Sequence, residues 1–111
     1  MTAASATARV PTRNASRYLQ QLCKHWQHGF AVTFTAEHGE IVFPRDARGA
    51  DWSGDARVTF DAEAEHLRIR IDAREAGQLE ALTGAVESHL DRFAFREAQL
   101  SYRWERATSA S

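Results

Sequence analysis

Two consecutive runs of alternating apolar and polar residues constrain the fold more than any other feature of this chain. In Ala56–Ala62 and again in His66–Ala73, every second side chain is apolar and the residues between them are polar. This period of two is that of a β-strand with one buried face. Only the turn Glu63-Ala64-Glu65 separates the two runs, so we predict an antiparallel hairpin.

Four other segments are short, rich in apolar residues and flanked by turn residues, which predicts strands. A turn at His38-Gly39 joins two of them into a second hairpin. In the last segment we expect Leu100, Tyr102 and Trp104 to face the core. The four segments are Ala8–Pro11, Phe30–Thr35, Glu40–Phe43 and Leu100–Trp104.

Two segments carry apolar residues at steps of three and four, the spacing of a helix with one buried face. The first helix follows Asn14, a good N-cap, and is expected to end at about His28, with Gly29 in the left-handed conformation. The second is predicted over Arg74–Phe93. The apolar stripes consist of Ala15, Tyr18, Leu19, Leu22 and Trp26 in the first helix and Leu79, Leu82, Val86, Leu90 and Phe93 in the second.

The predicted order of elements is β-α-β-β-β-β-α-β. Strands that are polar on one face favour an antiparallel sheet with the helices packed on its other face. We therefore predict an α+β two-layer sandwich, with two helices on one face of a mainly antiparallel sheet. It forms one domain over residues 8–106, because 111 residues are too few for two cores. Residues 1–7 and 107–111 are small and polar, and we expect them to be disordered.

The composition excludes several classes of function. A net charge of −1 and the lack of a long apolar run give no general attraction to nucleic acid or to a membrane. A single cysteine excludes an internal disulfide and, with no secretory signal at the N-terminus, indicates a cytoplasmic protein. The common phosphate-loop, dinucleotide, hydrolase and zinc-protease signatures are absent, so no cofactor is implied.

The first helix carries residue types that bind metals or act as nucleophiles, namely Cys23, His25 and His28. Successive helical residues turn by about 100°, so these three side chains cannot converge on one ion. His25 becomes a candidate only with His89, which borders the stripe of the second helix. If the helices lie side by side, the pair could bind a metal or act as general acid and base. Otherwise His89 is a packing residue with a hydrogen-bond partner.

Basic side chains are a second candidate feature. Lys24, with Arg92 and Arg96 near the end of the second helix, would attract an anionic ligand. Alternatively, the two arginines stabilise the negative end of that helix. Outward-facing arginines of the strands could form a basic strip, but no aromatic residue interleaves with them, so a protein partner or solubility explains them better than nucleic acid. The strip consists of Arg57, Arg68, Arg70 and Arg103.

Two motifs resemble those of a small bacterial family, domain of unknown function 2218. They are A-R-V-x-T-x-x-A-S-R-Y-L-x-Q-L-C-K-H-W at Ala8–Trp26 and S-H-L-D-R-F-A-F-R-E at Ser88–Glu97, and the resemblance extends over about Ala8–Arg106. Some relatives are attached to siderophore-interacting, flavin-dependent ferric reductases. The resemblance therefore implies a link to iron or siderophore handling. The loop Arg45–Ser53 is longer than the compact turn of the family.

The leading interpretation is a non-catalytic ligand- or partner-binding module, an accessory to iron or siderophore metabolism. Its partner would be a ferric reductase or a siderophore-type ligand. One alternative is a small enzyme with a histidine as general acid and base. Another is a structural domain whose sheet edges form a homodimer. The candidate surface consists of Cys23, Lys24, His25, His89, Arg92 and Arg96, with His25 and His89 as candidate metal ligands.

Overall fold

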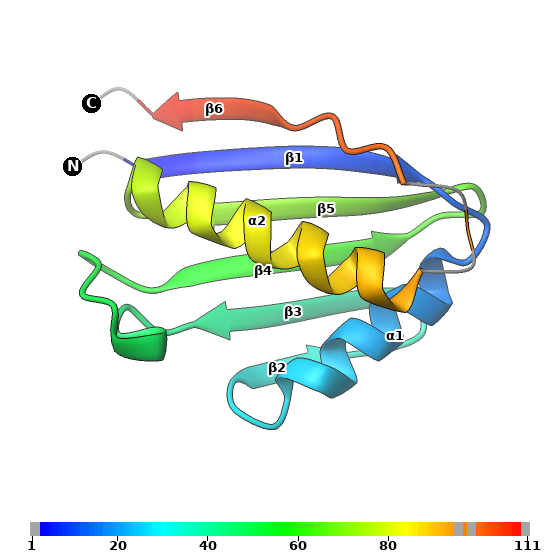
Figure 1. The fold of residues 1–111 in the computed structure, drawn as a ribbon, viewed down its shortest axis with the longest axis horizontal. Helices are drawn as coiled ribbons and strands as arrows, with labels where there is room; N and C mark the ends of the chain where they lie inside the picture. Colours follow the sequence, from blue (N-terminus) through cyan, green and yellow to red (C-terminus); the bar gives the residue numbers. More distant parts are fainter. Residues whose placement is uncertain (1–2, 95–96, 98–99, 110–111) are drawn as a thin grey trace.

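Six strands form a single antiparallel sheet, and two helices cover one of its faces (Figure 1). The computed structural model describes residues 3–94, 97 and 100–109. The elements follow the predicted order, so the two-layer α+β fold is confirmed. The strands are β1 (Ala3–Pro11), β2 (Ala31–Phe34), β3 (His38–Phe43), β4 (Ala56–Ala62), β5 (His66–Ala73) and β6 (Glu105–Ser109), and the helices are α1 (Ala15–Trp26) and α2 (Ala76–Phe93).

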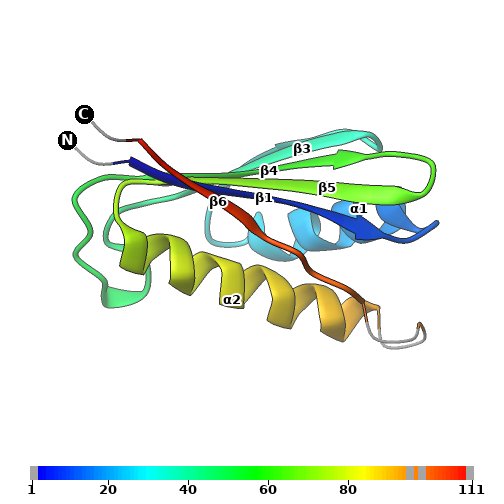
Figure 2. The same cartoon turned by 90° about the horizontal axis from the view of Figure 1, so that it is seen from above.

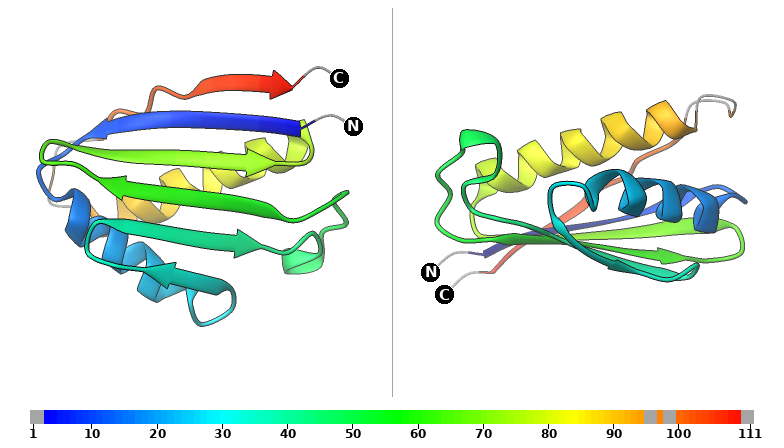
Figure 3. Two further views of the ribbon diagram at one scale, coloured as in Figure 1. Left: turned by 180° about the vertical axis from the view of Figure 1, so that it is seen from behind. Right: turned by 90° about the horizontal axis from the view of Figure 1, so that it is seen from below.

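The order of the strands across the sheet differs from their order along the chain. Across the sheet it is β2-β3-β4-β5-β1-β6, so β1 lies between β5 and β6, and β2 and β6 form the edges. Both helices lie on one side of the sheet, as Figure 2 shows, and the opposite side carries no helix (Figure 3). In the described part of the chain, no helix is long and apolar enough to cross a membrane.

The core lies between the sheet and the two helices. β4 and β5 have the bounds that the alternation predicted, and Val58, Phe60 and Ile71 have no exposed surface. The stripe of α1 is buried as well, and Leu19 and Leu22 are fully inaccessible. Burying one such side chain stabilises a fold by about 1.5–3 kcal/mol. These side chains therefore hold the helices against the sheet.

β1 begins at Ala3, five residues earlier than predicted. Residues 4–7, which we expected to be disordered, pair with both β5 and β6, and Ala3 pairs with β6. The prediction was wrong because small residues are typical of mobile chain ends. Here Ala4, Ala6 and Ala8 occupy the buried face, where their short side chains let α2 pack against β1.

The last strand also differs from the prediction. β6 spans Glu105–Ser109 rather than Leu100–Trp104, and includes residues 107–109 of the tail that we expected to be disordered. The alternation before β6 is real, but its side chains face α2 instead of a neighbouring strand. Tyr102 and Trp104 donate hydrogen bonds of 2.8 and 2.6 Å to carboxylates of α2. This segment therefore carries the chain from the end of α2 back to the sheet.

Two glycines have roles other than those predicted. α1 ends before Gly29, and among the described glycines only Gly49 has a positive φ, of 79°, so the left-handed stop at Gly29 is wrong. Gly39 lies within β3, and the hairpin turns at residues 35–37. A Cβ atom at Gly39 would lie 2.7 Å from Cys23 Sγ. This glycine therefore allows α1 to lie close on the sheet.

Candidate functional site

α1 and α2 run in opposite directions, but α1 has 12 residues and α2 has 18. α1 therefore lies beside only the C-terminal half of α2 (Figure 1). The loop between β3 and β4, residues 44–55, lies beside the other half and contains a short 3-10 turn, η1 (Ala47–Gly49). The end of α1, the first half of α2 and this loop thus surround one region on the helix side of the sheet.

A cavity of about 240 Å³ lies between these three walls, and we call it the wedge cavity. Four aromatic rings line it, those of Trp26, Phe30, Phe43 and Trp52. The ring of Phe43 packs against Trp26 and Phe30, with centroid distances of 5.5 and 4.8 Å. Side chains of α2 and of the loop, mostly alanines but including Leu82 and the polar Gln78, complete the lining. The wedge cavity is therefore mostly apolar, as small-molecule sites usually are.

Polar contacts hold the loop of the wedge cavity in place. Gln78, only 2% exposed, accepts a hydrogen bond from the Arg74 amide (2.8 Å) and donates one to the Gly54 carbonyl (2.9 Å). The Ser53 amide donates to Glu75 at 2.7 Å. The amide of Gln78 is thus already satisfied on both sides, and its role is to fix the loop to α2.

His25 of α1 and His89 of α2 meet between the two helices. This is the side-by-side arrangement in which we considered them as a candidate pair for metal binding or acid–base chemistry. Their ring centroids are 4.9 Å apart and the rings are tilted by 47°. His89 also lies 4.9 Å from the ring of Trp26. A carbonyl only accepts, so His89 Nδ1 donates the 2.7 Å bond to Ala85. In the neutral ring Nε2 is then the acceptor, and the pair supports the Trp26 wall of the wedge cavity.

Cys23 lies under α1 with no exposed surface, against Gly39. Burial raises the pKa of its thiol to about 11, so the thiol stays protonated near neutral pH. An inaccessible thiol that stays protonated is not prepared to act as a nucleophile. Cys23 therefore leaves the candidate surface, because helical spacing alone does not report how deeply a residue is buried. Among the described residues, no group of three or more His, Cys, Asp and Glu could hold a metal ion.

The charged candidates lie elsewhere. Lys24 is exposed and lines a shallow depression on α1 with two arginines. Arg92 is exposed in the last turn of α2, where a positive charge favours the helix dipole. Arg96 lies outside the described residues. Among the described members of the proposed set, the structure therefore brings together only the two histidines.

A cluster of hydrogen bonds around the carboxylate of Glu97, which the sequence did not predict, joins the motifs Ala8–Trp26 and Ser88–Glu97. Glu97 accepts hydrogen bonds from the hydroxyls of Thr12 (3.0 Å) and Tyr18 and from the Asn14 amide (3.3 Å). Partial burial opposes ionisation of Glu97, but these hydrogen bonds outweigh it and lower its pKa. Burial and the nearby Glu97 raise the pKa of Tyr18 to about 12. Asn14 therefore precedes α1 as predicted, but its side chain does not cap the helix.

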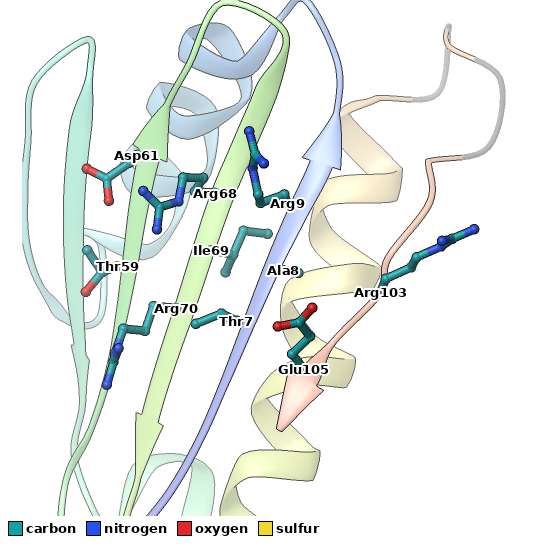
Figure 4. Close-up of a pocket in the computed structure, with 10 residues that line it drawn as sticks. All are labelled: Thr7, Ala8, Arg9, Thr59, Asp61, Arg68, Ile69, Arg70, Arg103 and Glu105. Carbon is teal, nitrogen blue, oxygen red and sulfur yellow. The ribbon is translucent and has the colours of Figure 1, made fainter. Parts of the chain in front are cut away.

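The helix-free face of the sheet holds a second hollow, of about 470 Å³ (Figure 4). Arg9 and Arg68 both lie near Glu63, at 3.3 and 3.9 Å, and Arg70 binds both carboxylate oxygens of Asp72. In Figure 4 the guanidinium groups point in different directions. They do not converge as they would in an anion site. Three arginines of the predicted basic strip line the hollow, Arg68, Arg70 and Arg103.

Comparison with known proteins agrees with the resemblance of the motifs. The family model DUF2218, described as an uncharacterized protein conserved in bacteria, matches residues 7–105. The chain belongs to this family. This DUF2218 chain is also similar to the NMR structure of PA4090 from Pseudomonas aeruginosa, with 28% identity and a TM-score of 0.66 over 95% of this chain and 96% of that one. No curated protein sequence matches it.

The two motifs of this DUF2218 chain thus form one continuous seam. At one end Tyr18 binds Glu97, and at the other His89 packs on Trp26 next to the wedge cavity. Hydrogen bonds hold the first end, and ring contacts hold the second. This arrangement can keep an apolar cavity open beside two histidines.

Proposed function

We propose that this protein is a binding module that holds a small aromatic or apolar ligand in the wedge cavity. The observation that carries the proposal is the lining of that cavity by four aromatic rings, with a loop anchored over it by Gln78. Concave, mostly apolar sites surrounded by aromatic side chains are typical of small-molecule binding. An apolar cavity of about 150 Å³ accepts benzene, so 240 Å³ leaves room for a planar ring such as a phenol or an indole.

The histidines contribute by holding a wall of the site. His89 packs on Trp26, and His25 packs on His89, so both restrict the ring that a ligand would contact. Lys24 and Arg92 do not line the cavity, and we assign them no contact with the ligand.

The accessory role in iron or siderophore metabolism is the finer part of the proposal. It rests on the family resemblance, and the chemistry of the cavity is compatible with it. Siderophores of the catecholate class carry planar aromatic rings, whereas those of the hydroxamate class do not need them. A preference for a ferric catecholate over a ferric hydroxamate therefore distinguishes siderophore binding in the wedge cavity from general attraction to iron. A ferric reductase as partner is tested separately by pull-down.

The test is a titration of the protein with indole, catechol, a ferric catecholate and a ferric hydroxamate, followed by amide and indole NMR signals. We expect saturable shifts of the Trp26 and Trp52 indole signals with at least one aromatic probe. Ala85→Phe fills the cavity from α2 and should weaken binding at least tenfold. Ser88→Phe places the same ring on an exposed part of α2 and should leave binding unchanged.

Two results would overturn the proposal. If no aromatic probe gives saturable shifts, the ligand class is wrong. If Ala85→Phe binds as tightly as the unaltered protein, the site is wrong. Thermal unfolding of each variant shows whether it has kept its fold.

The alternative of a small histidine enzyme has one observation in its favour. The bond from His89 Nδ1 to the Ala85 carbonyl leaves Nε2 as the basic atom, which is how a general base is commonly oriented. In the same titration, slow conversion of a bound probe by the unaltered protein but not by His89→Gln would favour the enzyme. Equal conversion, or none, would count against it.

A further inference from the structure

The edge strand β2 is unprotected against pairing with another strand. In the described part of the chain it pairs with β3 on one side and with no strand on the other. Sheet edges are usually protected by charged side chains, prolines or bulges. β2 (Ala31–Phe34) has the sequence AVTF, which contains none of these residues, and its pairing with β3 is regular.

The hydrogen bonds of the hairpin determine which groups of β2 are free. The Thr35 amide donates to the His38 carbonyl at 2.7 Å. Hydrogen-bonded pairs alternate along an antiparallel ladder, so Thr33 is also bonded to β3. Val32 and Phe34 therefore direct their amide and carbonyl groups away from the sheet. Their side chains lie half-buried on the helix side.

We propose that two copies of this protein associate by antiparallel pairing of their β2 strands. In this register Val32 lies opposite Phe34 of the second copy, and Thr33 lies on the two-fold axis. Each free amide and carbonyl of Val32 and Phe34 then finds a partner, and the two sheets become one continuous sheet. On the helix side, Val32 contacts the aromatic ring of the second copy, a favourable cross-strand pair.

The neighbouring register is poorer for a specific reason. Placing Val32 opposite Val32 would pair Phe34 with Phe30 of the second copy. The Phe30 amide already donates to the Trp26 carbonyl at 3.0 Å, so one bond would be lost at each end. The structure of a single copy therefore favours the register centred on Thr33 over this neighbouring one.

Charge also favours a second copy as the occupant. A two-fold interface places the same surface on both sides, so a charged edge would repel itself. β2 carries no charge, and the flank of α1 nearest the hairpin turn presents Ser16 and Gln20. Ser16 donates to the Ala36 carbonyl, and Gln20 donates to Ser16. β2 itself therefore sets no like charges against each other in a two-fold pairing. The contact is short, so we expect weak, concentration-dependent association.

The experiment combines analytical ultracentrifugation with amide hydrogen exchange over a concentration series from low micromolar to near millimolar. We expect a monomer–dimer equilibrium, with Val32 and Phe34 amides protected only at high concentration. The Thr33 amide, which is bonded within one copy, should be protected throughout. Unchanged exchange of Val32 and Phe34 while dimers form would overturn the proposal.

Thr33→Lys is the decisive variant. Thr33 is exposed on the helix-free face opposite Glu40, so a lysine fits the single copy and gains a partner. On the two-fold axis, however, the two lysines would oppose each other, and dimerisation should weaken at least tenfold. Ser101→Lys adds the same charge at an exposed site outside β2 and should dimerise normally. Equal dimerisation of both variants would refute the register centred on Thr33. If the Val32 amide becomes protected from exchange only after another protein is added, that protein is the partner of β2 instead of a second copy.

Discussion

Replacing Gly39 by alanine tests how closely α1 approaches the sheet. The new Cβ would lie 2.7 Å from Cys23 Sγ and 3.3 Å from Phe34 Cβ. Overpacking of this kind costs about 1–3 kcal/mol of unfolding free energy. We expect a loss of about 2 kcal/mol, because Cys23 has no exposed surface and its sulfur is surrounded by packed atoms. Urea unfolding followed by tryptophan fluorescence measures the loss, provided that the denaturant slope is unchanged.

A double-mutant cycle with Cys23→Ala makes the test specific. Cys23→Ala alone deletes one buried heavy atom and should cost about 1 kcal/mol. In the double variant the new Cβ enters the space that the sulfur left, so the total loss should stay near 1 kcal/mol rather than rise to about 3 kcal/mol. Losses that add to within about 0.5 kcal/mol would refute the contact between Gly39 and Cys23.

Four other changes have defined outcomes. Gly84 lies at an exposed site of α2, where an added Cβ would have no neighbouring atom within 4 Å, so Gly84→Ala should raise the unfolding free energy by about 0.5–1 kcal/mol in urea. A lower unfolding free energy would contradict the exposed position of Gly84. Glu97→Gln should cost about 1 kcal/mol near neutral pH. Since folding lowers the pKa of Glu97, that cost should disappear as the pH falls through the folded-state pKa, and persistence in acid would speak against the cluster. The thiol of Cys23 should react with an aromatic disulfide reagent only after denaturation, and fast reaction of the native protein would contradict its burial. Asp61→Asn should lower the pKa of His38, because the 2.7 Å hydrogen bond that His38 Nδ1 donates to the Asp61 carboxylate raises that pKa. NMR titration of His38 measures the change, and an unchanged pKa excludes the pair. The stability that this pair adds is present below the unfolded-state pKa of histidine and is lost as the pH rises through the folded-state value.

Alternation of residues predicted the centre of the sheet well. In β4 and β5 most apolar residues are large and most polar ones are charged, so the period of two is unambiguous. β1 was only partly predicted, because alanines and serines carry little information on burial. The segment before β6 alternates because it faces α2, and a sequence pattern reports a buried side but not the element that covers it.

The candidate site shows the same limit. His25 and His89 each border an apolar stripe, so local spacing was enough to predict that they could meet. The depth of Cys23 depends on Gly39, which local patterns interpret as a turn residue. The bond between Tyr18 and Glu97 joins residues 79 positions apart, and helical periodicity carries no information at that separation. The position of the wedge-cavity loop likewise depends on a contact between distant residues, the hydrogen bond from Gln78 to Gly54, which are 24 positions apart.

The position of β1 in the sheet has a consequence for synthesis of the chain. β1 leaves the ribosome first, but its two neighbours, β5 and β6, are made much later. Strand pairing of this long-range kind is slow to form. Until Ala73 has emerged, β1 has neither partner, and the hairpin of β2 and β3 is complete before it does. The nascent chain therefore carries β1 as an unpaired inner strand until β5 has been made, and this exposes β1 to misassembly.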